Sequence, residues 1–260
     1  MLRSIIIALQ TYSRIPMPQV EWTEKSMKYA ICFFPVVGIF TGGFEILWVF
    51  LAGLLHLPAL IYGAVACAIP ILVSGAIHMD GFCDTVDALS SHQSKERMLE
   101  ILKDSHAGAF AIIFGALYLI VYFASWSGLA TIIEWHGGSW NILFAVCFGF
   151  ILSRGLSGLA LNLFRGARSR GMLQGFKDAA DKKMLTITML IYIVVAAFFM
   201  IFFAGWIGAV MVAANGLLFL YYRLLSYRKF GGITGDLAGW FLQLSELTTI
   251  VAAVLLGFVL

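Results

Sequence analysis

Three aspartates lie close together in one short stretch of the chain, Ile77-His78-Met79-Asp80-Gly81-Phe82-Cys83-Asp84-Thr85-Val86-Asp87-Ala88-Leu89. If this stretch is helical, Asp80, Asp84 and Asp87 fall at positions i, i+4 and i+7 and project from one narrow face. Like charges on one face repel one another unless a cation lies between them. Hard divalent ions prefer oxygen ligands, so the spacing predicts a Mg²⁺ site that also binds phosphate oxygens. The alternative is the acidic first turn of a solvated helix, where aspartate is favourable.

The residues before these aspartates are strongly apolar, with no charged side chain from Ile46 to Ile77. The whole chain of 260 residues is 61% hydrophobic and 12% charged, whereas soluble domains have about 45–50% and about 25%. This composition excludes an ordinary soluble globule and predicts a polytopic membrane protein. Because no polar linker or low-complexity tract divides the chain, we expect residues 1–260 to form a single membrane-embedded catalytic domain.

Seven apolar segments are each long enough to cross a hydrocarbon core of about 30 Å. They lie at residues 31–55, 58–77, 108–133, 140–161, 184–204, 206–222 and 237–259. We therefore predict an all-α fold, a polytopic helical bundle of about seven transmembrane helices, with a tight turn near Gly205. We expect residues 1–30 to form a partly amphipathic segment before the first span. In residues 94–103 apolar and charged positions alternate, which predicts a helix at the membrane interface.

Basic side chains are distributed unevenly among the connections between these segments. If the amino terminus is cytoplasmic, sixteen of the seventeen Lys and Arg residues fall on the cytoplasmic side. The external connections near His56, near residues 134–139 and near Gly205 contain none. This asymmetry follows the positive-inside rule and predicts an inner-membrane protein with its acidic motif in the cytoplasm. The formal charge of +3 reflects this topology, and no basic stripe with interleaved aromatics indicates a nucleic-acid partner.

Two further groups of residues are candidates for function. The loop Phe230-Gly231-Gly232-Ile233-Thr234-Gly235-Asp236 leads into the last apolar segment, where backbone N–H groups can cradle phosphate oxygens. Such glycine pairs are also common in simple turns between helices. Glu45 and Glu246 lie inside apolar segments, and carboxylates within a membrane are costly enough to be functional candidates.

Several motifs in the same order make the chain resemble the cobalamin synthases, which are adenosylcobinamide-GDP ribazoletransferases. The motifs are Thr11 to Pro18, Phe34-Pro35-Val36-Val37-Gly38, His78-x-Asp80-Gly81-x-x-Asp84-x-x-Asp87, Arg97-Met98-Leu99-Glu100-Ile101-x-Lys103-Asp104-Ser105, Ser153-Arg154-Gly155 and Gly231-Gly232-x-Thr234-Gly235-Asp236. The chain departs from the usual pattern at Ala88, His106, Trp240 and Gln243. These departures leave the aspartate cluster whole.

The resemblance implies a Mg²⁺-dependent attack by α-ribazole, or its 5′-phosphate, on adenosylcobinamide-GDP, with release of GMP. Such chemistry depends mainly on positioning and charge neutralisation. Asp80 and Asp84 are then expected to bind the metal, Asp87 to be a third ligand or the base, and His78 to be the reserve candidate for the base. The expected substrate-binding residues are Gly81, Arg97, Lys103, Asp104, Ser105, Arg154, Gly231, Gly232, Thr234, Gly235, Asp236 and Glu246.

Two alternatives remain open at this stage. CDP-alcohol phosphotransferases and membrane prenyltransferases also arrange aspartates around Mg²⁺ and a diphosphate, although this chain has neither a DGxxAR signature nor an NDxxD run. A transporter is the other class, since Glu45 and Glu246 could line an ion path. Besides its small-molecule substrates and the lipid bilayer, the expected partners are further copies of the chain or other enzymes of the corrinoid pathway. Small residues such as Gly149, Gly155 and Gly158 allow the helices to pack within one chain or against further copies of it.

Overall fold

The structure, a computed structural model, describes residues 1–104, 106–168 and 171–259, apart from the side chain of Trp135. Within these residues the regular structure is helical, with one isolated β-bridge between Gly166 and Ile233. The α-helices are α1 (Leu2–Tyr12), α2 (Glu24–Met27), α3 (Phe34–Leu54), α4 (Ala59–Ser74), α5 (Ile77–Ser90), α6 (Lys95–Ile101), α7 (Ala109–Trp135), α8 (Asn141–Leu163), α9 (Met172–Ala179), α10 (Lys182–Leu225) and α11 (Gly235–Gly257). A short 3-10 helix (Ile31–Phe33) precedes α3, and a π-helix (Ser226–Phe230) follows α10. The all-α prediction is confirmed.

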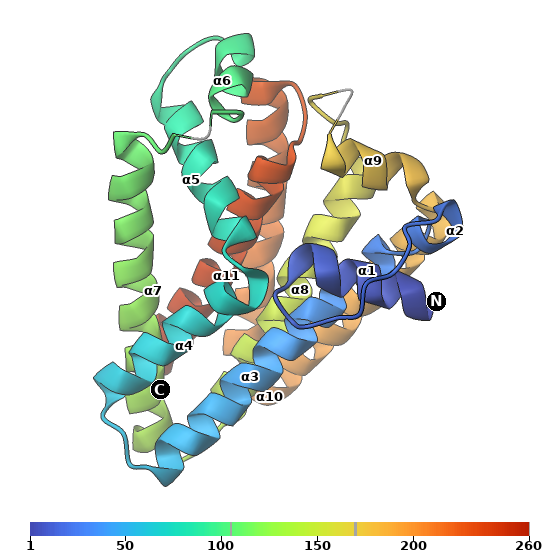
Figure 1. The fold of residues 1–260 in the computed structure, drawn as a ribbon. Helices are drawn as coiled ribbons and strands as arrows, with labels where there is room; N and C mark the ends of the chain where they lie inside the picture. The colour runs from blue at the N-terminus through green and yellow to red at the C-terminus, as the bar shows by residue number, and fades with distance from the viewer. Residues whose placement is uncertain (105, 169–170, 260) are drawn as a thin grey trace.

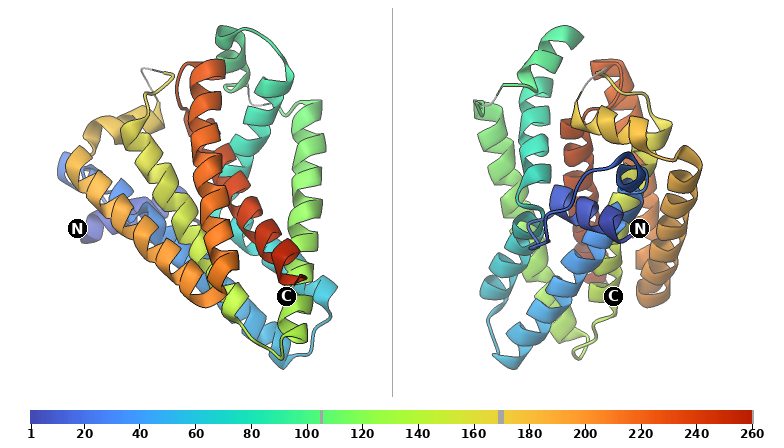
Figure 2. Two further views of the ribbon diagram at one scale, coloured as in Figure 1. Left: turned by 180° about the vertical axis from the view of Figure 1, so that it is seen from behind. Right: turned by 45° about the vertical axis from the view of Figure 1, so that its right-hand side comes forward.

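Five helical segments of the described chain are long and apolar enough to cross a membrane, or six if α4 and α5 count together as one span. One of the five covers the whole of α10, yet α10 breaks at Gly205, where φ is 56° and ψ is −129°. A Cβ atom on Gly208 would collide with the backbone of Met200, so the two halves of α10 fold back on each other (Figure 2). The predicted helical membrane bundle and the tight turn at Gly205 are therefore confirmed.

The span predicted at residues 58–77 differs from the structure. Helix α4 ends at Ser74, and α5 leaves at an angle of 93°. The bend lies at Gly75 and Ala76, whose φ angles are 62° and 64°, a left-handed conformation that is strained for alanine. The side chain of Arg14 occupies the space where Gly75 would carry a Cβ atom. The apolar run continues to Ile77, so hydropathy alone extends the span past the break.

Helices α5, α7 and α11 form one side of the molecule, and α3, α8 and the first half of α10 form the other (Figure 1). The second half of α10 runs beside α11, where the ring of Tyr222 stacks on that of Phe241 (Figure 2). Between the two sides lies a core that includes Tyr122 and Trp126 of α7 and Phe241 of α11, each at most 1% exposed. Large apolar side chains point outward elsewhere, such as Ile112 of α7 at 66% exposed and Phe202 of α10 at 67%. A surface of this kind is suited to lipid tails.

The connections of the bundle gather at two opposite ends. The α3–α4 and α7–α8 connections and the Gly205 turn lie at the lower end in Figure 1, and α6 and the loop before α11 lie at the upper end. The lower connections, residues 55–58 and 136–140, contain no Lys or Arg. The charge asymmetry of the sequence thus separates two ends of the structure, and the assignment of the upper end to the cytoplasm stays a prediction.

Candidate functional site

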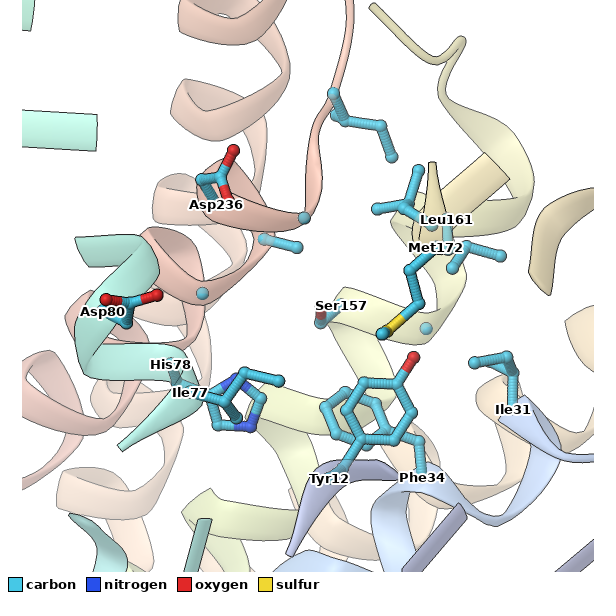
Figure 3. A pocket seen from close by; sticks show the side chains of 16 residues that line it. Tyr12, Ile31, Phe34, Ile77, His78, Asp80, Ser157, Leu161, Met172 and Asp236 are labelled. Carbon is cyan, nitrogen blue, oxygen red and sulfur yellow. The ribbon is translucent and has the colours of Figure 1, made fainter. Parts of the chain in front are cut away.

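A cavity of about 220 Å³ opens beside the first turn of α5 (Figure 3). It receives Tyr12 from α1, Phe34 from α3, His78 and Asp80 from α5, and Asp236 from α11. Its remaining lining residues are Ile31, Ile77, Ser157, Gly158, Leu161, Met172, Leu173, Ile233, Gly235, Ala238 and Gly239. The fold therefore brings Asp80 and Asp236, which are far apart in the sequence, into one cavity.

The close crossing of α5 and α11 explains this arrangement. A Cβ atom on Gly81 would lie 2.7 Å from the backbone oxygen of Asp236, and one on Gly239 would lie 2.9 Å from the backbone oxygen of His78. Only glycine allows two helix backbones to approach so closely. Gly81 is buried, so it sets the distance between the helices, and its predicted contact with substrate stays a prediction.

The three aspartates of α5 have different surroundings. Asp80 is exposed and Asp84 is half-buried, and Asp80, Asp87 and Asp236 all lie near enough to repel the Asp84 carboxylate electrostatically. Asp87 accepts hydrogen bonds from the backbone N–H groups of Gly108, at 2.6 Å, and Ala111, at 2.9 Å. Asp87 therefore caps the amino terminus of α7, a position where a carboxylate is favourable.

The residues present fit a Mg²⁺ ion held in one particular way. Among the described residues, no three His, Cys, Asp or Glu side chains gather closely enough to hold a metal by themselves. Mg²⁺ commonly binds through one or two carboxylates and completes its coordination with water and substrate phosphates. Asp80 and Asp84, one helical turn apart, provide this donor set, and both oxygens of Asp87 already accept backbone hydrogen bonds. The metal roles of all three aspartates stay predictions.

His78 lies in the wall of the cavity. Its side chain is buried, Nε2 has no hydrogen-bond partner, and its ring centroid lies 6.5 Å from that of Tyr12 and 5.9 Å from that of Phe34. A buried imidazole nitrogen without a partner is costly, and the proton-acceptor role of His78 stays a prediction.

Arg154 and Glu246 form an ion pair inside the bundle. Arg154 Nη1 lies 2.6 Å from Glu246 Oε1, and both side chains are 1% exposed. Arg154 Nη1 also donates to the backbone oxygen of Phe150 and the hydroxyl of Ser153. Glu45 of α3 is also buried, and neither of its oxygens has a hydrogen-bond partner. The pair ties α8 to α11, and the expected substrate contacts of Arg154 and Glu246 stay predictions.

The glycine-rich loop before α11 is held against another loop. Ile233 N–H donates to Arg165 O, Ala167 N–H donates to Ile233 O, both at 2.9 Å, and a Cβ atom on Gly232 would lie 2.6 Å from Arg165 O. Gly231 has a φ of 80°, which favours glycine. Thr234 caps α11 by accepting from Leu237 N–H at 3.2 Å. The structure gives this loop a positioning role, and its predicted phosphate contacts stay predictions.

The residues expected to bind substrate after α5 lie at the upper end. Arg97 is exposed and pairs with Glu100 at 2.7 Å, as expected for a solvated helix. Lys103 and Asp104 are exposed as well, and hydrogen bonds from the backbone and ring of His106 lower the pKa of Asp104. Ser105 lies outside the described residues. The structure does not place Arg97, Lys103 or Asp104 in the lining of the cavity.

Three features of the site were missed from the sequence. Arg168 Nη1 lies 3.8 Å from Asp236 Oδ2, and its Nη2 donates to Leu99 O at 2.9 Å, so it links α6 to α11. Tyr12 and Phe34 supply the aromatic wall. Arg168 belongs to a basic run that was used only to predict the membrane topology. Tyr12 and Phe34 belong to motifs that the chain shares with the cobalamin synthases, and this sharing could have marked them as site residues.

Comparison with known proteins identifies the family of this chain. The sequence family described as cobalamin-5-phosphate synthase matches residues 4–254. A protein from Lachnoclostridium phytofermentans named adenosylcobinamide-GDP ribazoletransferase is 45% identical over 98% of this chain and 94% of its own length. Two proteins of the same name also match. The one from Desulfitobacterium hafniense is 34% identical over 97% of this chain and 96% of its own length. The one from Carboxydothermus hydrogenoformans is 31% identical over 99% of this chain and 98% of its own length. No solved structure matches. The chain belongs to the cobalamin synthase family.

Proposed function

We propose that the chain transfers α-ribazole, or its 5′-phosphate, to adenosylcobinamide-GDP in a Mg²⁺-dependent reaction at the inner face of the cytoplasmic membrane. The observation that carries this proposal is the meeting of Asp80, His78 and Asp236 in one cavity, in a chain 45% identical to a protein named for this transfer. The reaction makes adenosylcobalamin, or its 5′-phosphate.

The bonds that change are those at one phosphorus atom. The ribazole hydroxyl oxygen forms a bond to the phosphorus next to cobinamide, the bond from that phosphorus to the bridging oxygen of the diphosphate breaks, and GMP leaves with the bridging oxygen. Mg²⁺ held by Asp80 and Asp84 would neutralise the charge of the diphosphate. The residues of the chain hold the reacting groups in place.

His78 is the residue that we propose as acceptor of the hydroxyl proton. His78 lines the cavity next to Asp80, whereas both oxygens of Asp87 already accept backbone hydrogen bonds. Asp236, paired with Arg168 and Thr234, is suited to hold a ribose hydroxyl next to Asp80.

The test is incubation of the purified full-length chain in liposomes with adenosylcobinamide-GDP and α-ribazole, with and without Mg²⁺. We expect equimolar GMP and adenosylcobalamin only when Mg²⁺ is present. Asp80→Ala and Asp84→Ala should each abolish both products while the protein keeps the thermal stability of the wild type. Full activity in either variant would remove the proposed metal role, and ion flux across the liposome without GMP release would favour a transporter.

A further inference from the structure

Asp80 lines a second cavity besides the one that contains His78. This cavity has a volume of about 410 Å³ and lies where the end of α1 meets the break between α4 and α5. Its lining residues are Gln10, Thr11, Ser13, Arg14, Ser74, Gly75, Ala76, Ile77 and Asp80. We call it the Arg14 cavity and the first one the His78 cavity. Asp80 therefore borders two cavities, and their chemical character differs.

The His78 cavity is suited to an aromatic ring with apolar edges. The ring centroids of Tyr12 and Phe34 lie 4.5 Å apart, and the Tyr12 and His78 rings are inclined by only 14°. Met172 lies beside Tyr12 (Figure 3), and a thioether packs favourably against aromatic rings. Leu161, Leu173 and Ile31 complete this part of the wall.

The wall formed by Tyr12, Phe34 and Met172 has no charged side chain to pair with guanine, because Asp80 and Asp236 lie across the cavity from it (Figure 3). A guanine edge carries donors and acceptors that need partners when they are buried. The base of α-ribazole is a benzimidazole, whose six-membered ring has only carbon at its edge. Ring stacking together with apolar walls suits the carbocyclic part of such a base.

The Arg14 cavity is suited to an anion. The Arg14 backbone N–H donates to Val73 O at 2.7 Å, which fixes this residue beside the break. Its guanidinium packs over Gly75 and makes no ion pair within the described part of the chain. Arginine binds phosphate through two parallel hydrogen bonds. Helix α5 also begins at this cavity, and its N-cap, Ala76, offers no side-chain acceptor to the first-turn N–H groups, so the positive end of the helix adds to the attraction.

We infer that the two substrates reach Asp80 from these two different cavities, an inference that rests on the proposed function. The aromatic base of α-ribazole stacks in the His78 cavity, and the diphosphate of the nucleotide-activated corrinoid binds in the Arg14 cavity. The ribazole hydroxyl and the phosphorus that it attacks then meet at the Asp80 carboxylate. Tyr12 is a specificity residue for the acceptor, and Arg14 is a binding residue for the donor.

The experiment measures KM for each substrate separately, with the full-length chain in liposomes. Tyr12→Leu should raise KM for α-ribazole about tenfold, the loss expected when one stacking ring is removed, and leave KM for adenosylcobinamide-GDP within about twofold. Arg14→Gln should give the reverse pattern, again about tenfold, because a charge-assisted bond to phosphate is lost. Tyr221→Leu, an exposed tyrosine of α10, and Arg3→Gln, at the other end of α1, are the matched controls and should change neither constant.

An exchanged pattern, in which Tyr12→Leu raises KM for the donor, would place the nucleotide in the His78 cavity and overturn the inference. Equal changes in both constants, or no change, would overturn it as well. Equilibrium dialysis with labelled 5,6-dimethylbenzimidazole riboside separates these outcomes from failure of the proposed function. If the wild type releases no GMP, the proposed function fails. The inference then survives only if the wild type binds the riboside and both Tyr12→Leu and Phe34→Leu lose this binding.

Discussion

Replacing Gly81 with alanine tests whether the crossing of α5 and α11 positions the reacting groups. The new Cβ atom would lie 2.7 Å from the backbone oxygen of Asp236 and 2.9 Å from its Cα atom, whereas ordinary contacts begin at 3.4 Å. Both of these atoms belong to the backbone, so a side-chain rotation cannot relieve the clash. The helices must separate locally by about 0.5–0.7 Å, and overpacking of this kind costs about 1–3 kcal/mol.

The separation should affect catalysis more than stability. Because a misplacement of about 1 Å can cost about 100-fold in rate, we expect GMP release by Gly81→Ala to fall by about 10- to 100-fold, with a modestly lower midpoint of thermal unfolding in detergent. The matched control is Gly216→Ala in α10, where a Cβ atom would meet nothing within 4 Å. It should keep full activity and gain up to about 1 kcal/mol from helix propensity. Wild-type GMP release by Gly81→Ala would refute the reasoning.

Three further predictions concern the supporting contacts. Glu246→Ala leaves the charge of Arg154 without its ion-pair partner in the bundle and should destabilise the protein by about 3–5 kcal/mol. Glu45→Gln changes a carboxylate that has no hydrogen-bond partner, so it should leave stability unchanged. Equal unfolding midpoints for the two variants would contradict this prediction. Asp87→Ala should lower the stability of the first turn of α7 by about 1–2 kcal/mol, and Asp87→Asn should lower it by less. The measurement is backbone hydrogen exchange at residues 108–112, which should become faster. Unchanged exchange would show that Asp87 does not cap the helix. Hydrogen bonds from Met184 N–H and Lys28 lower the pKa of Asp181 from its ordinary 3.8, so the stability that Asp181 provides is present above that pH and is lost as the pH falls through the lowered value. Asp181→Asn should flatten that part of an acid-unfolding curve, and an identical curve would show that the bonds contribute nothing.

The features predicted well are those encoded by local runs of sequence. The apolar segments, the turn at Gly205 and the helix α6 each depend on a few consecutive residues, and hydropathy or periodicity reports them directly. The break at Gly75 was missed because the apolar run continues past it through Ala76 and Ile77. The bend depends on Arg14, which packs over Gly75 from a distant part of the chain.

The candidate site was predicted in its residues more than in its geometry. The aspartate spacing identifies one helical face, yet the hydrogen bonds of Asp87 go to residues 21 and 24 positions away. Arg154 and Glu246 are 92 positions apart, and their pairing depends on how α8 packs against α11. Spacing within one helix cannot show which of its carboxylates will form a hydrogen bond or ion pair with another helix.

The central claim is that a divalent cation at Asp80 and Asp84 binds the diphosphate of the donor. The most direct test replaces a non-bridging oxygen of the cobinamide-side phosphate with sulfur, a soft atom that Mg²⁺ binds poorly and Cd²⁺ binds well. We expect GMP release from the sulfur-containing donor to fall strongly in Mg²⁺ and to recover when Cd²⁺ is added to the wild-type chain in liposomes. Equal rates for the oxygen and sulfur donors in Mg²⁺, with no effect of Cd²⁺, would contradict the account.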